Sequence, residues 1–367
     1  MIRKNAGISA LVAALLLSFA TARSLLADTI IVKGKAPISG VKVKSETFDK
    51  VVYIQRGKTK ELPSSEVLDV IHDGQSKAMR LGIEYLNLGD NLNAVEQFKA
   101  VVSQASGSGL PWLPEYANFY LGKADLGAGR FDAGAQALRK MIALKPDSRL
   151  LGEATVLLMR CLALSGKVKD GADFVGKLET AAKTPAQKLW VLEARLVAAE
   201  GLLDSGKARE AADLAKTLES KAKTLKAEGA NAFGARAMML EFEAHLAARN
   251  RPKAKNVLAE LKREGGKGNP HALAADFCCR AMEILDSSPV ESDLWKAVHF
   301  AGRTYVENLE AVSELPRTCY LLGLTHLRLS ESRSGEKEVA KGYFEELRRR
   351  FPETREAFLA RDQLKKM

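Results

Sequence analysis

The sequence predicts a mainly α-helical chain in which a small antiparallel β module precedes an α-solenoid of helical hairpins. In the stretch 116–148, two apolar runs at helical spacing flank Gly129 and end before Pro146. Similar stretches recur along the chain, and a hairpin of this kind buries its apolar face only against a neighbour. In addition, 46% of the residues are hydrophobic but only 6% are aromatic, which favours Ala- and Leu-rich helices over a β architecture.

Residues 1–27 have the three parts of a secretory signal peptide. Arg3 and Lys4 precede the apolar run 8–20, which is shorter than a comfortable membrane span, and small residues follow. Cleavage after Ala22 satisfies the small-residue rule. Cleavage after Ala27 is favoured because a predicted strand begins at once, and retention as an uncleaved anchor is the alternative. The signal predicts an exported protein of the periplasm or cell envelope.

Residues 28–73 are the predicted β module. Four short runs rich in Val and Ile, separated by glycine or aspartate turns, are expected to be strands: 29–32, 41–43, 51–54 and 67–71. Their pattern is similar to small β modules that precede helical repeats in some bacterial exported proteins.

The helical part begins with its clearest repeat. Leu81, Gly82 and Tyr85 are followed by Ala94 and Phe98, which resembles the L-G-x-x-Y and A-x-x-x-F pattern of the tetratricopeptide repeat. The resemblance implies a two-helix hairpin in which the glycine allows close helix approach, the small Ala keeps the crossing tight, and the two aromatic side chains fill the interior.

Later copies keep part of this pattern. One copy has Leu121, Gly122, Leu138 and Pro146, and the last copy has Leu322, Gly323, Ala340, Phe344 and Pro352. The turn glycines 89, 129, 166 and 206 are 40, 37 and 40 positions apart, against about 34 for the family. Asp125 stands where the family has Tyr. HEAT-type helical pairs are therefore the alternative for the middle of the chain.

The helical part is predicted to have two sections. The run 262–269, KREGGKGN, combines glycine and charge and predicts a linker. It separates repeats over 74–264 from C-terminal repeats and a cap over 265–367. The polar stretch 330–335 predicts an expanded turn, and 354–365 predicts a last helix. This final part resembles terminal repeats of periplasmic tetratricopeptide proteins.

No sequence motif indicates catalysis, a cofactor or a metal. The chain lacks a Walker A loop, a G-x-S-x-G elbow and a dinucleotide fingerprint, and its five histidines lack the H-E-x-x-H spacing. Cys161, Cys278, Cys279 and Cys319 show no C-x-x-C spacing. They are predicted to be small apolar residues, and a disulfide from Cys161 or Cys319 to the adjacent pair is the alternative. We therefore expect no enzyme activity, no cofactor and no metal.

The net charge of +11 raises the question of an acidic partner. Most cations alternate with Asp and Glu, and the basic clusters lack the interleaved aromatics that single-stranded nucleic-acid binders use. A solvated surface is the simplest interpretation. An anionic envelope surface is a more plausible counterpart than nucleic acid, which we do not expect to be a partner.

These patterns predict a non-enzymatic exported scaffold or adaptor that binds a protein or peptide. The tetratricopeptide resemblance implies that the partner lies along the first helices of the hairpins, at positions that flank the L-G pair. The matching residues are Asn87, Tyr116, Lys123, Arg317, Tyr320 and Arg328. The alternative is a structural or assembly subunit that oligomerises through its helical array or through the edge of its β module.

Overall fold

The structure is a computed structural model that describes residues 27–307 and 311–367. The chain divides into two compact units, 1–75 and 76–367. The predicted signal peptide lies outside the described residues, except for Ala27. None of the described helices is long and apolar enough to cross a membrane.

The first unit is a five-stranded antiparallel sheet with the strand order β4-β3-β2-β1-β5. Its elements are β1 (Asp28–Val32), β2 (Ile38–Glu46), β3 (Lys50–Gln55), β4 (Lys58–Pro63), the 3-10 turn η1 (Ser64–Glu66) and β5 (Val67–Ile71). The four predicted strands are present. The prediction missed β4, because this edge strand is almost wholly exposed and its sequence KTKELP has no buried apolar face.

A buried histidine that follows β5 contacts strands β1 and β2. The Nε2 atom of His72 lies 2.6 Å from Oε1 of Glu46, and its Nδ1 lies 3.6 Å from Oδ1 of Asp28. Asp28 also accepts hydrogen bonds from the backbone N–H groups of Val43 and Asp73, at 2.7 and 2.9 Å. Burial alone would lower the pKa of His72, but hydrogen bonds with Asp28 and Glu46 raise it to about 9.

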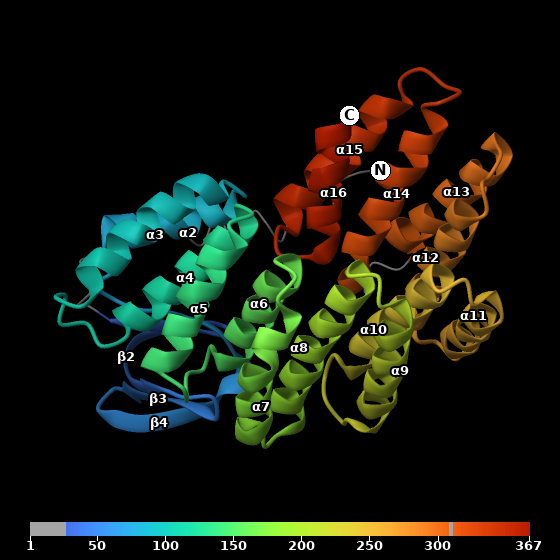
Figure 1. The fold of residues 1–367 in the computed structure, drawn as a ribbon. Helices are drawn as coiled ribbons and strands as arrows, with labels where there is room; N and C mark the ends of the chain where they lie inside the picture. Colours follow the sequence, from blue (N-terminus) through green and yellow to red (C-terminus); the bar gives the residue numbers. More distant parts are fainter. Residues whose placement is uncertain (1–26, 308–310) are drawn as a thin grey trace. The chain divides into compact units, whose positions relative to one another are not determined.

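The second unit contains α-helices α2 to α16 within the described residues (Figure 1). Their bounds are α2 (Lys77–Asn87), α3 (Asn91–Ala105), α4 (Leu113–Gly127), α5 (Phe131–Leu144), α6 (Leu151–Leu164), α7 (Ala172–Ala181), α8 (Pro185–Asp204), α9 (Ala208–Thr224), α10 (Ala230–Ala247), α11 (Arg251–Gly266), α12 (Pro270–Asp286), α13 (Glu291–Glu307), α14 (Leu315–Leu329), α15 (Glu336–Arg350) and α16 (Arg355–Lys366). Two 3-10 segments, η2 (Val168–Gly171) and η3 (Val312–Glu314), precede α7 and α14.

The helices of the second unit pack in two rows. Each helix packs on the next, and the even-numbered helices from α2 to α14 also pack on one another in order. We call these even-numbered helices the first-helix row. In α10, a member of this row, twelve of eighteen residues are buried, whereas only three of sixteen are buried in α11. From α4 to α15, each odd-numbered helix is less buried than the even-numbered helix before it, whereas in the first hairpin α3 is more buried than α2.

Glycines in the first-helix row confirm the predicted close approach within three hairpins. A Cβ atom at Gly82 would lie 2.7 Å from the ring of Phe98, and one at Gly122 would lie 2.5 Å from Cγ of Leu138. A Cβ at Gly323 would overlap the ring of Phe344. The predicted turn glycines, Gly89, Gly129, Gly166 and Gly206, all have positive φ angles between 73° and 80°, which glycine adopts without steric cost.

The predicted linker at 262–269 is wrong for most of its length. Helix α11 continues to Gly266, and only 267–269 connect it to α12. Gly265 lies in this helix because it packs closely and not because it breaks the chain. A Cβ atom at Gly265 would lie 3.1 Å from the backbone of Leu273, so the missing Cβ lets α11 approach α12.

Glycine packing in the last repeat predicts opposite effects for two substitutions. Gly323→Ala is expected to destabilise the helical unit by about 1–3 kcal/mol, because the new methyl group overlaps Phe344. Gly342→Ala in the neighbouring α15 is the matched control, since nothing lies within 4 Å of its Cβ position; a change between zero and about 1 kcal/mol of stabilisation is expected. Urea unfolding measures both, and equal effects would contradict the packing argument.

The sheet is predicted to lose stability as the pH rises. The pKa of His72 is about 9 in the folded chain and ordinarily 6.5, so the stabilisation is complete below pH 6.5. It is then lost between pH 6.5 and 9, and amounts to at most about 3 kcal/mol. Hydrogen exchange of the β1 and β5 amides should show this loss in the wild type and not in His72→Gln. An NMR titration of the His72 ring with a midpoint near 6.5 would disprove it.

Candidate functional site

The last helix of the chain returns to the middle of the first-helix row. Arg355 is the first residue of α16, which Thr354 caps through its side chain. The Arg355 guanidinium donates from Nε and Nη2 to Asp204 at the end of α8, at 2.5–3.0 Å, and from Nη1 to Glu243 in α10, at 3.0–3.2 Å. These contacts join residues 151 and 112 positions apart. They bring α16 onto α8 and α10.

A second buried arginine extends the same group of charges. Nη1 of Arg317, in α14, donates to Oε2 of Glu243 at 2.8 Å, and its Nη2 lies 2.9 Å from Oε1 of Glu356. We call Asp204, Glu243, Arg317, Arg355 and Glu356 the ionic cluster. Its three carboxylates outnumber its two guanidiniums, and every member pairs with an opposite charge.

The ionic cluster holds Glu243 in its charged form. Burial alone would raise the pKa of Glu243, but Arg317 and Arg355 lower it to about 2. Both arginine side chains are at least nine-tenths buried. Such a group is costly to take apart, because removing one partner leaves a buried charge uncompensated.

Apolar and peripheral contacts also fix α16. Ala357 and Ala360 pack with Phe344 and Leu347 of α15 in one buried cluster. On the side facing α5, Phe358 packs edge-on against Phe131, with ring centroids 5.4 Å apart. Helix α16 is therefore held by an apolar face toward α15 and by a mixed charged and aromatic face toward α5, α8 and α10.

Near the start of α16, Lys123 of α4 lies between two carboxylates. Its Nζ is 3.2 Å from Glu153 in α6 and 3.1 Å from Glu353, just before α16. Burial alone would lower the pKa of Lys123, but the two carboxylates raise it. This ion pair adds α4 and α6 to the helices that the C-terminal segment contacts.

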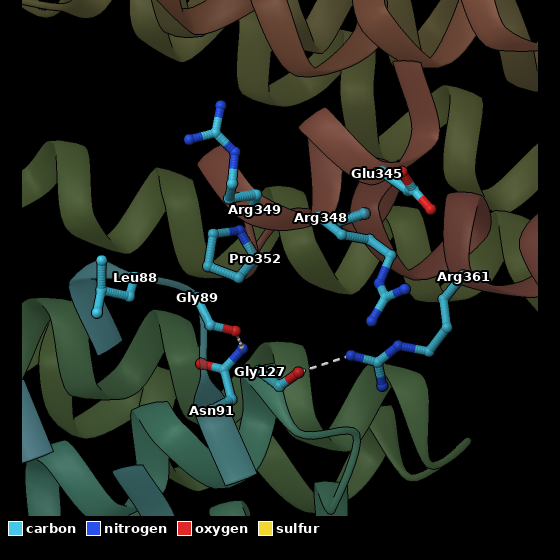
Figure 2. Close-up of a pocket in the computed structure, with 10 residues that line it drawn as sticks. Leu88, Gly89, Asn91, Gly127, Glu345, Arg348, Arg349, Pro352 and Arg361 are labelled. Atoms are coloured by element: carbon cyan, nitrogen blue, oxygen red, sulfur yellow. Dashed lines mark hydrogen bonds between the residues drawn. The ribbon is translucent and has the colours of Figure 1, made fainter. Parts of the chain in front are cut away.

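A pocket of about 240 Å³ lies between the start of the helical unit and its C-terminal helices (Figure 2). Leu88 and Gly89 line it from the turn that follows α2, Asn91 from the start of α3 and Gly127 from the end of α4. Glu345, Arg348, Arg349, Pro352, Ala357 and Arg361 line it from α15 and α16. Arginine is the dominant polar residue of this pocket.

The structure places the six predicted binding residues in two groups. Tyr116, Lys123, Arg317 and Tyr320 have partners within the chain, whereas Asn87 and Arg328 are exposed, on α2 and α14. Tyr116 accepts a hydrogen bond from Arg149 at 3.0 Å, and Tyr320 packs on Phe344 with ring centroids 6.0 Å apart. Lys123, Arg317 and Tyr320 are the three that contact the C-terminal segment.

The prediction missed most of the ionic cluster. Asp204, Glu243, Arg355 and Glu356 appear in the sequence as charged positions on helices, and such positions are usually solvated. The sequence contains one indication of the cluster, which is the adjacent pair Arg355 and Glu356 at the start of a helix after Pro352.

Three histidines have carboxylate partners that the sequence does not indicate. Besides His72, two histidines that stand alone in the sequence face a carboxylate in the fold: His271 lies 3.1 Å from Glu314, and His326 lies 2.6 Å from Glu336.

All four cysteines are buried and free, so the alternative of a disulfide is wrong. Burial raises the pKa of the Cys161 thiol to about 12. Among residues 27–307 and 311–367, no group of three or more side chains is arranged to hold a metal ion.

The sequence matches no family model and no curated protein. Within the chain, the paired charges and the contact between Phe131 and Phe358 fix α16 against helices that are distant in sequence.

The ionic cluster gives a prediction for the stability of the helical unit. Glu243→Gln is expected to destabilise it by roughly 3 kcal/mol, because Arg317 and Arg355 each lose a buried partner. The control Asp293→Asn removes the exposed pair with Lys296 and should cost about 0–1 kcal/mol.

Urea unfolding at several pH values measures this difference. Because the pKa of Glu243 lies below its ordinary 4.5, its contribution is complete above pH 4.5 and is lost as the pH falls toward 2. A wild type and a Glu243→Gln variant of equal stability at pH 7 would refute the assigned role of the cluster.

Proposed function

We propose that the protein is an exported, non-enzymatic scaffold of tetratricopeptide type, whose α-solenoid binds a protein or peptide partner along the first-helix row. The observation that carries this proposal is the seating of α16. The row holds this helix through the exposed Asp204 on α8, the half-buried Glu243 on α10 and the buried Arg317 on α14. The Phe131 ring of the neighbouring α5 packs on Phe358 of the same helix. The same chemistry suits a partner helix that carries both charges and an aromatic residue.

The proposed partner binds beside α16 and not in its place. Tyr116, Lys123, Arg317 and Tyr320 already have intramolecular contacts. The exposed Asn87 on α2 and Arg328 on α14 therefore mark the available part of the row. Export to the cell envelope is part of the proposal, and it rests on the charge and apolar pattern of residues 1–27.

Affinity capture from an envelope fraction tests this function. The tagged mature chain is compared with the double variant Asn87→Glu/Arg328→Glu and with Arg209→Glu, an exposed control on α9. We expect the same partner to be recovered by the wild type and the control, and at least about fivefold less by the double variant. Recovery of nothing above background, or equal recovery by all three chains, would count against the proposal.

An assembly role is a second proposal, favoured by one feature of the sheet. Edge strand β4 carries Lys58, Lys60 and Glu61, which disfavour pairing with another chain, but edge strand β5 exposes Leu68 and Ile71. The measurement that separates the two roles is the mass in solution over a range of concentrations. A concentration-independent monomer would exclude assembly through β5.

A further inference from the structure

The arginine pocket of Figure 2 is chemically unlike the ionic cluster, although both involve α16. Figure 2 shows the guanidinium groups of Arg348 and Arg361 pointing toward each other beside the carbonyl of Gly127, whereas Arg349 points away from them. Arg348 comes from α15 and Arg361 from α16. Two like charges therefore converge from neighbouring helices on one small cavity.

Two contacts and a neighbouring glycine fix the position of Arg361. Its Nη2 donates to the carbonyl of Gly127 at 2.6 Å, and its guanidinium stacks on the ring of Phe358 at 5.3 Å. A Cβ atom at Gly129 would overlap Nη1 of Arg361, so this glycine leaves the space that the guanidinium fills. The Nε of Arg361 is buried and has no hydrogen-bond partner among the described residues. Arg361 is thus held in place while part of its hydrogen-bonding capacity is unused.

The positive charge of the pocket is not balanced by the chain itself. Arg317, Arg355 and Lys123 each contact two carboxylates. In residues 27–307 and 311–367, no carboxylate lies within 4.0 Å of a nitrogen of Arg348, Arg349 or Arg361, and Glu345, which lines the pocket, makes no ion pair there. Burial, together with the charge of Arg348, lowers the pKa of Arg361, as expected for like charges brought together.

We propose that this pocket binds a phosphate-type oxyanion between Arg348 and Arg361. A guanidinium presents a planar fork of N–H donors that matches phosphate oxygens, and two such forks neutralise a doubly charged anion. The cavity volume of about 240 Å³ is large enough for a phosphate group and a short attachment. Its source is either free phosphate or the headgroup of a phospholipid. This inference does not depend on the proposed scaffold function.

Isothermal titration of the full mature chain with inorganic phosphate tests the site, with sodium chloride of equal ionic strength as the reference. We expect phosphate to bind the wild type, and Arg348→Glu to bind it at least about tenfold more weakly, because a carboxylate replaces one of the two forks. Arg209→Glu, on the exposed face of α9, changes the net charge equally and should bind like the wild type. Equal loss in both variants would show a general charge effect and would overturn the site.

A second variant keeps the test decisive if Arg348→Glu disturbs folding. Arg361→Lys preserves the charge but removes the fork, and it is also expected to weaken phosphate binding, with circular dichroism confirming the fold. Phosphate binding that neither variant weakens would overturn the proposal. So would the absence of any difference between phosphate and chloride in the wild type.

Vesicle flotation distinguishes the two sources of phosphate. Vesicles of phosphatidylcholine with phosphatidic acid are compared with phosphatidylcholine alone. Flotation with phosphatidic acid that Arg348→Glu abolishes and Arg209→Glu retains supports a lipid headgroup. Binding of inorganic phosphate without flotation supports a soluble phosphate compound. Flotation that is equal in all chains, without phosphate binding in solution, would overturn the pocket assignment.

Discussion

The helical unit depends on the pairing of two buried guanidiniums with three carboxylates. Apolar packing explains why each hairpin forms and stacks on the next, but it acts between neighbours and does not bring α16 back to α8. Arg355 does so, by reaching Asp204 and Glu243 across more than a hundred residues. Because Arg317 and Arg355 are buried, arrangements that separate them from Glu243 are costly. We infer that the cluster selects one curvature among those that the stacked hairpins allow.

Two groups of arginines at the C-terminal end of the chain differ in how their positive charge is compensated. Arg355 is buried and has two carboxylate partners, so the chain itself supplies its counter-charge. Arg348 and Arg361 meet without one, and solvent reaches Arg348. A pair of like charges in this position is tolerated because water screens it, but an oxyanion compensates it better. The contrast within one hairpin makes the pocket a site for an external anion.

Local features of the fold could be read from the sequence. Gly89, Gly129, Gly166 and Gly206 end helices with positive φ, and the L-G pairs pack on Phe98, Leu138 and Phe344, because both signals depend on residues within one hairpin. The ionic cluster could not be read in this way. Asp204 is indistinguishable in sequence from a solvated helix end, and its partner Arg355 lies 151 positions later in the chain. The same reason hides the partner of His271, since Glu314 lies 43 positions away.

Strand β4 and the end of α11 differ from the prediction because amino-acid composition indicates local structure only indirectly. Strand β4 was missed because an edge strand needs only backbone pairing and its side chains remain polar. The stretch that ends α11 was interpreted as a linker because glycine signals a break in most contexts. Here Gly265 serves close packing against Leu273. The physical role of a glycine therefore depends on whether another backbone approaches it, and the sequence alone does not contain that information.

The seating of α16 also constrains how a scaffold of this kind can bind its partner. A partner that replaced α16 would have to replace the carboxylate that Glu356 offers to Arg317 and the guanidinium that Arg355 offers to Glu243, since these two groups would otherwise pair only with each other. It would also compete with a helix tethered to the same chain, which has a high effective concentration. Binding along the exposed part of the row avoids both costs. For this reason the buried members of the predicted binding set are better understood as part of the frame, and Asn87 and Arg328 as part of the surface that a partner meets.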